Sequence, residues 1–267
     1  MDIHPLRLLY FSPTGTTRKV VQAIAQGLGL NIAEDLDLTL PQTRLGSVSS
    51  IQGGVTIIGT PVYTGRVAFE AVLRLRQLQA SNALAVVVVV YGNREYEDAL
   101  LELRNMAMEV GFTPCAGAAF IGEHSFSTDE TPIATGRPDN SDVNRGRIFG
   151  KMLLNKVTSI SALHDCSHLS VPGSFPYRER GPTHATSPET RDALCVRCGK
   201  CVEVCPVKAI TLHHDGVYTD KNKCLLCCAC VKNCPTGARI LGDMRLLQFA
   251  RNLTLSCLQR KEPEFYL

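Results

Sequence analysis

Two runs of cysteine carry the clearest chemistry in this 267-residue sequence. Nine of its twelve cysteines fall between positions 195 and 234, and each run has the spacing Cys-x2-Cys-x2-Cys-x3-Cys followed by proline. A chain that is kept reduced uses such a cluster to bind metal through thiolates rather than to form disulfides. The repeated thiols are Cys195, Cys198, Cys201 and Cys205 in the first run and Cys224, Cys227, Cys230 and Cys234 in the second.

The spacing of the two runs resembles that of bacterial two-cluster ferredoxins, and the resemblance implies a 2[4Fe-4S] domain in which the fourth cysteine of each run ligates the other run's cluster. Zinc is the alternative, but structural zinc sites normally use two separated ligand pairs, whereas three close thiolates and a distant fourth favour a cubane. The ninth cysteine, Cys228, aligns with Gly199 and is expected not to be a ligand. The implied ligand sets are Cys195, Cys198, Cys201 and Cys234 for one cluster and Cys205, Cys224, Cys227 and Cys230 for the other.

A second candidate site lies near the N-terminus, where the loop 12–17 follows an apolar stretch and opens a helix. A helix N-terminus offers unpaired N–H groups and a partial positive charge, and hydroxyls add further donors, so this loop suits a phosphate monoester. The sequence has neither the lysine of a Walker loop nor a GxGxxG pattern. An ordinary Ser/Thr-capped helix is the alternative. The candidate phosphate-binding residues are Ser12, Thr14, Gly15, Thr16 and Thr17.

Two further loops, 59–66 and 91–96, follow predicted strands and place tyrosine and glycine at the same sheet edge. With the phosphate loop they resemble the flavodoxin-like family, in which such loops enclose the isoalloxazine ring of FMN. The phosphate motif matches residue by residue, and the two ring loops match in position and type only. The sequence lacks tryptophan, so Tyr63 and either Tyr91 or Tyr96 would stack on the flavin, although Tyr96 also fits an apolar helix face. The candidate ring-loop residues are Pro61, Val62, Tyr63, Gly65, Tyr91, Gly92, Asn93, Arg94 and Tyr96.

The elements that must position these residues alternate between strand and helix. Short apolar strands are predicted at 6–11, 32–36, 55–59, 84–91 and 113–121, with helical periodicity between most of them. A last helix is predicted at 142–157, N-capped by Ser141. This pattern predicts a doubly wound parallel α/β sheet, and the flavodoxin resemblance implies five strands in the order 2-1-3-4-5. The predicted layout is a flavodoxin-like domain at 1–165, a linker at 166–190, a small α+β ferredoxin-like domain at 191–242 and a tail at 243–267.

Composition limits the setting and the partners of the chain. The longest strongly apolar run, Ala83–Val90, is too short to span a membrane, and the N-terminus lacks a secretion signal, so we expect a cytoplasmic protein. The net charge of +3 does not indicate nucleic acid. Residues 191–240 carry eight cationic and four anionic side chains, so we expect this region to attract an acidic redox partner such as a soluble ferredoxin.

Together the two halves resemble the flavodoxin/ferredoxin fusion proteins of anaerobes, and the resemblance implies FMN and two [4Fe-4S] clusters. Two functions stay open. An electron carrier would pass electrons between a low-potential donor and a partner enzyme, and this reading is preferred. A flavin-dependent reductase of a small organic molecule would need a proton donor, for which His124 is the candidate because it follows the fifth strand at the ligand-bearing edge. A lone loop histidine is more often a surface or hydrogen-bonding residue.

Overall fold

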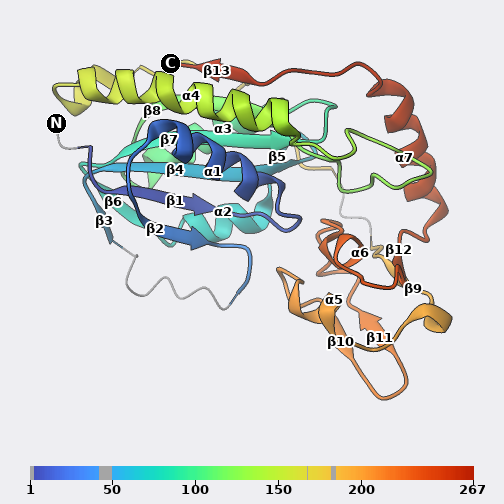
Figure 1. Ribbon diagram of the computed structural model, residues 1–267. Coiled ribbons are helices and arrows are strands. Elements are labelled where there is room, and N and C mark those ends of the chain that lie inside the picture. Colours follow the sequence, from blue (N-terminus) through green and yellow to red (C-terminus); the bar gives the residue numbers. More distant parts are fainter. Residues whose placement is uncertain (1–2, 42–49, 167, 182–184) are drawn as a thin grey trace.

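The computed structural model describes residues 3–41, 50–166, 168–181 and 185–267 (Figure 1). Its larger part is built on five parallel strands whose order is β2-β1-β4-β7-β8. Numbered among themselves these strands run 2-1-3-4-5, which is the flavodoxin-like order expected from the sequence. Their bounds are β1 Leu6–Tyr10, β2 Ile32–Asp37, β4 Val55–Tyr63, β7 Leu84–Tyr91 and β8 Thr113–Ile121.

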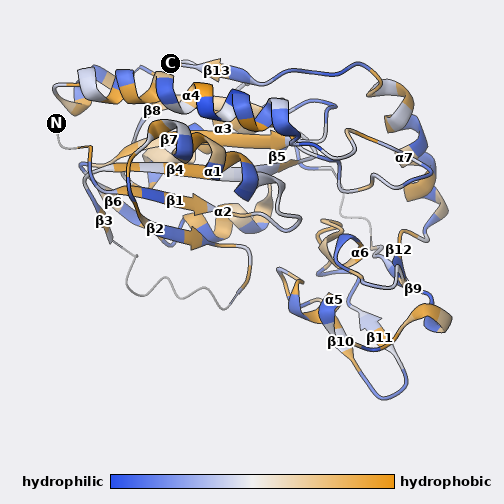
Figure 2. Ribbon diagram, in the orientation of Figure 1, coloured by the Kyte–Doolittle hydropathy of each residue, from blue (hydrophilic) through white to orange (hydrophobic). Residues whose placement is uncertain are grey.

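Helices cover both faces of this sheet (Figure 1). Helices α1 (Thr16–Leu28) and α4 (Asn140–Ser159) pack on one face, and α2 (Phe69–Leu75) and α3 (Ala99–Glu109) pack on the other. Successive residues of β7 contribute alternately to the two hydrophobic cores. The continuous valine run therefore reflects burial on both faces. Figure 2 shows hydrophobic residues on the strands at the centre of the sheet.

Helix α4 begins earlier than the sequence predicted. Its N-cap is Asp139 rather than Ser141, because the Asp139 carboxylate accepts a hydrogen bond from the Asp142 N–H at 3.0 Å. The Asp142 carboxylate in turn accepts from the Asp139 N–H at 2.9 Å. This reciprocal pair satisfies two N–H groups at once and outcompetes a single serine hydroxyl.

The sheet has seven strands rather than five. Strand β4 continues into a hairpin with β5 (Arg66–Val67), and β13 (Glu264–Tyr266) pairs antiparallel with β8. The segment expected as a tail therefore contains this edge strand and the preceding helix α7 (Met244–Ser256). The Phe265 ring stacks on Phe149 of α4 with centroids 4.7 Å apart. This packing covers an edge of β8 that would otherwise be open.

The segment between the two domains contacts the larger one along α3. The Asp98 carboxylate accepts hydrogen bonds from the Ser174 N–H at 2.8 Å and the Arg178 N–H at 2.7 Å. The Arg180 guanidinium pairs with the buried Glu102 at 2.9 Å.

The larger domain has two further minor elements. A two-stranded sheet joins β3 (Ser50–Gln52) to β6 (Gln79–Ser81), and a 3-10 turn, η2, covers Leu163–Cys166.

The cysteine-rich domain is small and repeats its own geometry. A left-handed residue precedes each of its short helices, Gly199 (φ 75°) before α5 and Cys228 (φ 57°) before α6. This match explains why a glycine and a cysteine align in the two runs. The elements are β9 Glu189–Thr190, η3 Asp192–Leu194, α5 Lys200–Glu203, β10 Ile210–Leu212, β11 Val217–Thr219, α6 Ala229–Lys232 and β12 Arg239–Ile240.

Among the described residues, no helix combines the length and the apolar character needed to cross a bilayer.

Candidate redox site

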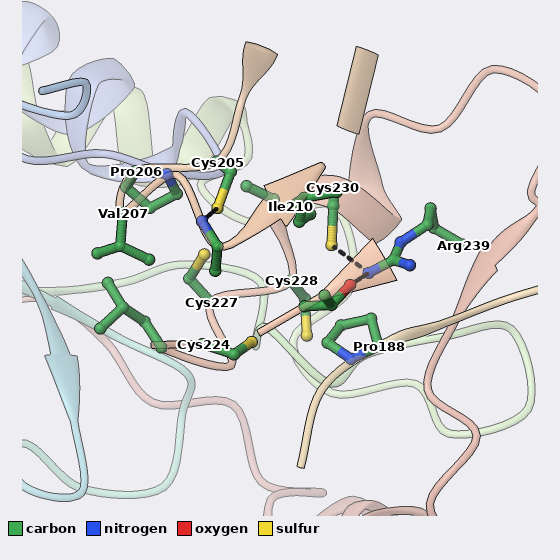
Figure 3. Close-up of a pocket in the computed structure, with 14 residues that line it drawn as sticks. Pro188, Cys205, Pro206, Val207, Ile210, Cys224, Cys227, Cys228, Cys230 and Arg239 are labelled. Atoms are coloured by element: carbon green, nitrogen blue, oxygen red, sulfur yellow. Dashed lines mark hydrogen bonds between the residues drawn. The ribbon is translucent and has the colours of Figure 1, made fainter. Parts of the chain in front are cut away.

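The eight repeated cysteines line two separate hollows. Each hollow takes three cysteines from one run and the last cysteine of the other. Figure 3 shows the side chains that line the first hollow, among them those of Cys205, Cys224, Cys227 and Cys230. The division is the one implied by the ferredoxin resemblance: Cys205, Cys224, Cys227 and Cys230 in the first hollow, and Cys195, Cys198, Cys201 and Cys234 in the second.

The donor set suits an iron-sulfur cluster, because each hollow gathers four of the repeated thiols. Four thiols spaced around a hollow leave room for a core of four irons and four sulfides. The eight repeated cysteines thus have the chemistry and the spacing for [4Fe-4S] clusters.

Backbone N–H groups point at several of these sulfurs. The Ala209 N–H donates to Cys205 Sγ at 3.2 Å, and the Leu226 N–H donates to Cys224 Sγ at 3.5 Å. Such bonds stabilise a thiolate without adding a net charge. The turn after Pro206 and the turn before α6 supply these two donors.

Cys228 also lines the first hollow, but its surroundings differ from those of the repeated thiols. Its side chain packs with Leu241 and Leu246, and its Sγ lies 3.5 Å from the Leu226 carbonyl oxygen. A thiol that donates to a carbonyl agrees with a structural rather than a ligand role, which stays a prediction.

The phosphate loop offers unpaired donors at the start of α1. Ser12 Oγ accepts a hydrogen bond from the Arg18 N–H at 3.0 Å, so this hydroxyl shapes the loop. The N–H groups of Thr16 and Thr17, the first two residues of the helix, have no intrahelical acceptor. Thr17 Oγ1 is buried and has no hydrogen-bond partner within the described structure. An orphaned hydroxyl beside free N–H groups at a helix N-terminus fits a phosphate.

The first ring loop is a tight hairpin between β4 and β5. Tyr63 pairs with Arg66 across a turn in which Thr64 (φ 53°) and Gly65 (φ 78°) are both left-handed. This geometry matches the right-handed twist of the flanking strands. The left-handed φ of Gly65 is one that side chains rarely adopt, so this position favours glycine. Burial and the nearby thiols of Cys227 and Cys228 raise the pKa of the half-buried Tyr63.

The second ring loop is held by the C-terminal segment. The Asn93 amide donates to the carbonyls of Cys257 (2.9 Å) and Gln259 (2.8 Å), and its Oδ1 accepts from the Lys261 N–H at 3.1 Å. The Tyr96 hydroxyl bonds to Glu264 and Tyr266. Sequence reasoning missed this segment, whose signal was the aromatic pair at 265–266.

The tyrosines of this loop lie mainly in the protein core. The rings of Tyr91 and Tyr96 are both buried and lie 5.3 Å apart. Arg94 pairs with Glu97 at 3.0 Å. The side chains of Asn93, Arg94 and Tyr96 therefore have protein partners, and flavin contact by them stays a prediction. Tyr63 alone of the three candidate tyrosines lies beside the cysteine domain.

His124 packs against the second ring loop. Its ring packs so closely on Gly92 that a Cβ there would lie 2.2 Å from the ring. Its Nδ1 accepts a hydrogen bond from the Phe126 N–H at 3.0 Å, which places the ring proton on Nε2. Burial lowers the pKa of His124 to about 4, aided by the cations Arg94 and Lys232. Near neutral pH the ring carries no acidic imidazolium proton.

Two contacts join the cysteine domain to the sheet edge. The buried Arg74 of α2 donates to the Pro206 carbonyl at 2.6 Å, one residue after Cys205. Lys232 of α6 donates to the Ser127 carbonyl at 2.6 Å and pairs with Glu123. These contacts hold the cysteine domain near the end of the sheet at which α2 and the loop after β8 lie (Figure 1).

The cysteine-rich domain matches a known family. Residues 194–238 match the 4Fe-4S dicluster domain. An uncharacterised polyferredoxin-like protein of Methanocaldococcus jannaschii is 50% identical over 32 residues, which are 12% of this chain and 20% of that protein. The chain thus spans about a fifth of the length of the curated relative it matches.

Solved structures similar to the larger domain share low identity with it. A flavodoxin from the domain Archaea is 13% identical, with a TM-score of 0.38 and coverage of 57% of this chain and 98% of that one. Rubredoxin oxygen:oxidoreductase from Desulfovibrio gigas is 12% identical, with a TM-score of 0.40 and coverage of 58% and 37%. A Fusobacterium nucleatum flavodoxin mutant bound to flavin mononucleotide is 12% identical, with a TM-score of 0.38 and coverage of 57% and 94%.

Proposed function

We propose that this chain, which joins a sheet of flavodoxin-like strand order to a ferredoxin-type dicluster domain, is an electron-transfer iron-sulfur flavoprotein that relays electrons between two [4Fe-4S] clusters and FMN. One observation carries the proposal. Tyr63 of the first ring loop lies close enough to Cys227 and Cys228 for these thiols to raise its pKa, and Leu225, next to Cys224, packs against the same hydrophobic core as Tyr63. The second cysteine run therefore lies beside the loop assigned to the flavin.

Each group has a separate task in this relay. The phosphate loop would hold FMN, and the hairpin bearing Tyr63 would flank its ring. The two sets of thiolates would hold the clusters. Bound iron-sulfur clusters carry single electrons, whereas FMN takes up one or two. Fixing them in one chain removes the need for a diffusional encounter.

The burial of the thiols supports an order of transfer. Cys198 is exposed, whereas Cys205, Cys227 and Cys230 are buried. Leu194 and Val196, which flank Cys195, are also exposed. We therefore assign exchange with an external redox protein to the cluster of Cys195, Cys198, Cys201 and Cys234, and exchange with FMN to the other cluster.

The partner in this proposal is an acidic redox protein, such as a soluble ferredoxin, because the cations beside the exposed Cys198 would attract it. The compartment is the cytoplasm, where thiolates remain reduced. A reductase acting through His124 is less well supported, because a ring with a pKa of about 4 is a weak proton source at neutral pH.

Cofactor content and the transfer path can both be measured. An anaerobic spectrum with iron, sulfide and flavin quantitation should give about eight irons, about eight sulfides and about one FMN per chain. Cys227→Ser should slow reduction of the flavin by a reduced ferredoxin in stopped flow, and the matched control Cys228→Ser should not. Equal rates of flavin reduction in both variants would show that electrons reach the flavin without passing through the clusters.

A further inference from the structure

The two halves of the cysteine-rich domain differ at one buried position. Five residues after the last cysteine of each run, Ile210 begins β10 and Arg239 begins β12. Both are buried: Ile210 is 4% exposed and Arg239 is 3% exposed. A cation thus occupies, in the second half of the repeat, the place of an aliphatic side chain in the first.

The Arg239 guanidinium is held by neutral groups and a sulfur. Its Nη1 donates to Thr190 Oγ1 at 2.8 Å, and its Nη2 donates to Thr219 Oγ1 at 3.0 Å and to Cys230 Sγ at 3.7 Å. Figure 3 shows the guanidinium beside Cys230. Its Nε is buried and lacks a partner among the described residues. Within the described parts of the chain, no carboxylate forms an ion pair with the Arg239 guanidinium.

Arg239 lines both hollows. A buried guanidinium without a carboxylate requires another anion, because removing a charge from water is costly. The two sets of four thiolates are the anions available on either side. The guanidinium therefore has the place and the charge to act on both.

We propose that Arg239 sets the reduction potentials of the two clusters, with its larger effect on the cluster held by Cys230. The inference rests on the proposed function in that the hollows hold [4Fe-4S] clusters. A cluster gains one negative charge on reduction, and a fixed cation stabilises the reduced form more than the oxidised form. A low dielectric strengthens this difference. Arg239 thereby raises both potentials.

The test compares midpoint potentials of the isolated holoprotein by EPR-monitored redox titration. Arg239→Gln removes the charge and keeps donors for Thr190 and Thr219, and Arg239→Ile copies the side chain of Ile210. In both, reduction of the Cys230 cluster should become about tenfold less favourable, a fall of about 59 mV for one electron. Arg239→Lys should retain most of the wild-type potential. Arg191→Gln, which removes an exposed cation of the same domain, should leave both potentials unchanged.

Iron and sulfide content decides the remaining cases. If the two neutral variants lose their clusters and Arg239→Lys keeps them, the charge of Arg239 is required and the inference stands. Loss in all three variants, or intact clusters with wild-type potentials in Arg239→Gln, would overturn it. A wild-type protein without iron would instead contradict the proposed function. Failure of the Arg239 inference and failure of the proposed function are therefore distinguishable.

Discussion

At the scale of single residues, a buried hydroxyl without a partner is the most informative feature of the phosphate loop. Leaving such a group unpaired costs about 1–3 kcal/mol, which a phosphate oxygen would recover on binding. Thr17→Val should therefore weaken FMN by about tenfold or more and weaken riboflavin little. Fluorescence titration of the flavin-free protein measures both affinities.

The matched control is Thr56→Val, because Thr56 Oγ1 on β4 is also buried and unpaired but lies at the far end of that strand from the ring loop. It should leave FMN affinity unchanged. If Thr17→Val weakened both flavins equally, the phosphate would bind elsewhere.

Crossed ligation gives a second prediction at this scale. Cys205 belongs to the first run but lines the hollow of the second. The cluster that survives in Cys205→Ser should therefore have the same EPR spectrum and potential as the one that survives in Cys224→Ser. A match to the survivor in Cys201→Ser would mean that each run binds its own cluster.

At the scale of elements, the C-terminal segment is held to the second ring loop mainly through Asn93. Asn93→Ala removes three hydrogen bonds and leaves the Cys257 and Gln259 carbonyls short of a donor, so we expect a loss of about 2–4 kcal/mol in the free energy of unfolding. Urea unfolding measures this, and hydrogen exchange should rise over 257–266. Asn144→Ala, at an exposed position of α4, is the control. Unchanged exchange in that segment would show that β13 holds it alone.

The elements that could be predicted from the sequence are those with a clear hydrophobic pattern within their own residues. The valine run of β7 and the periodic faces of α1 and α3 are long enough to be recognised by pattern. Strands β5 and β13 have two and three residues, and their existence depends on pairing with β4 and β8. Pairing between segments far apart in the chain leaves almost no local pattern, so these elements could not be predicted.

The same limit applied to parts of the candidate site. The cysteine spacing is local and specific, so both thiol sets could be proposed from sequence. Arg74 and Lys232, which join the two domains, are single cations on helices that resemble solvated faces. Asn93 was singled out for the flavin because its loop lies at the right edge, and only the structure shows the segment that its amide binds.

At the scale of the whole molecule, charge should decide how an external partner approaches. Residues 191–240 have four more cationic than anionic side chains, and two oxidised clusters would bring about four negative charges. The loaded domain is then near neutral overall. If the proposed acidic donor docks here, local cations beside the exposed Cys198, rather than net charge, would attract it.

Two pairs of cations test where that donor docks. Arg197 and Lys200 flank the exposed Cys198, and Lys221 and Lys223 precede Cys224. Arg197→Glu with Lys200→Glu should slow cluster reduction by an acidic ferredoxin more than Lys221→Glu with Lys223→Glu does, and both should slow it at low salt. Arg147→Glu with Lys151→Glu on α4 makes the same change in net charge and should have little effect. Stopped-flow rates at several salt concentrations separate these cases, since steering weakens toward physiological strength, where the Debye length is about 8 Å. Rates indifferent to both pairs and to salt would mean that electrons enter elsewhere, at the flavin.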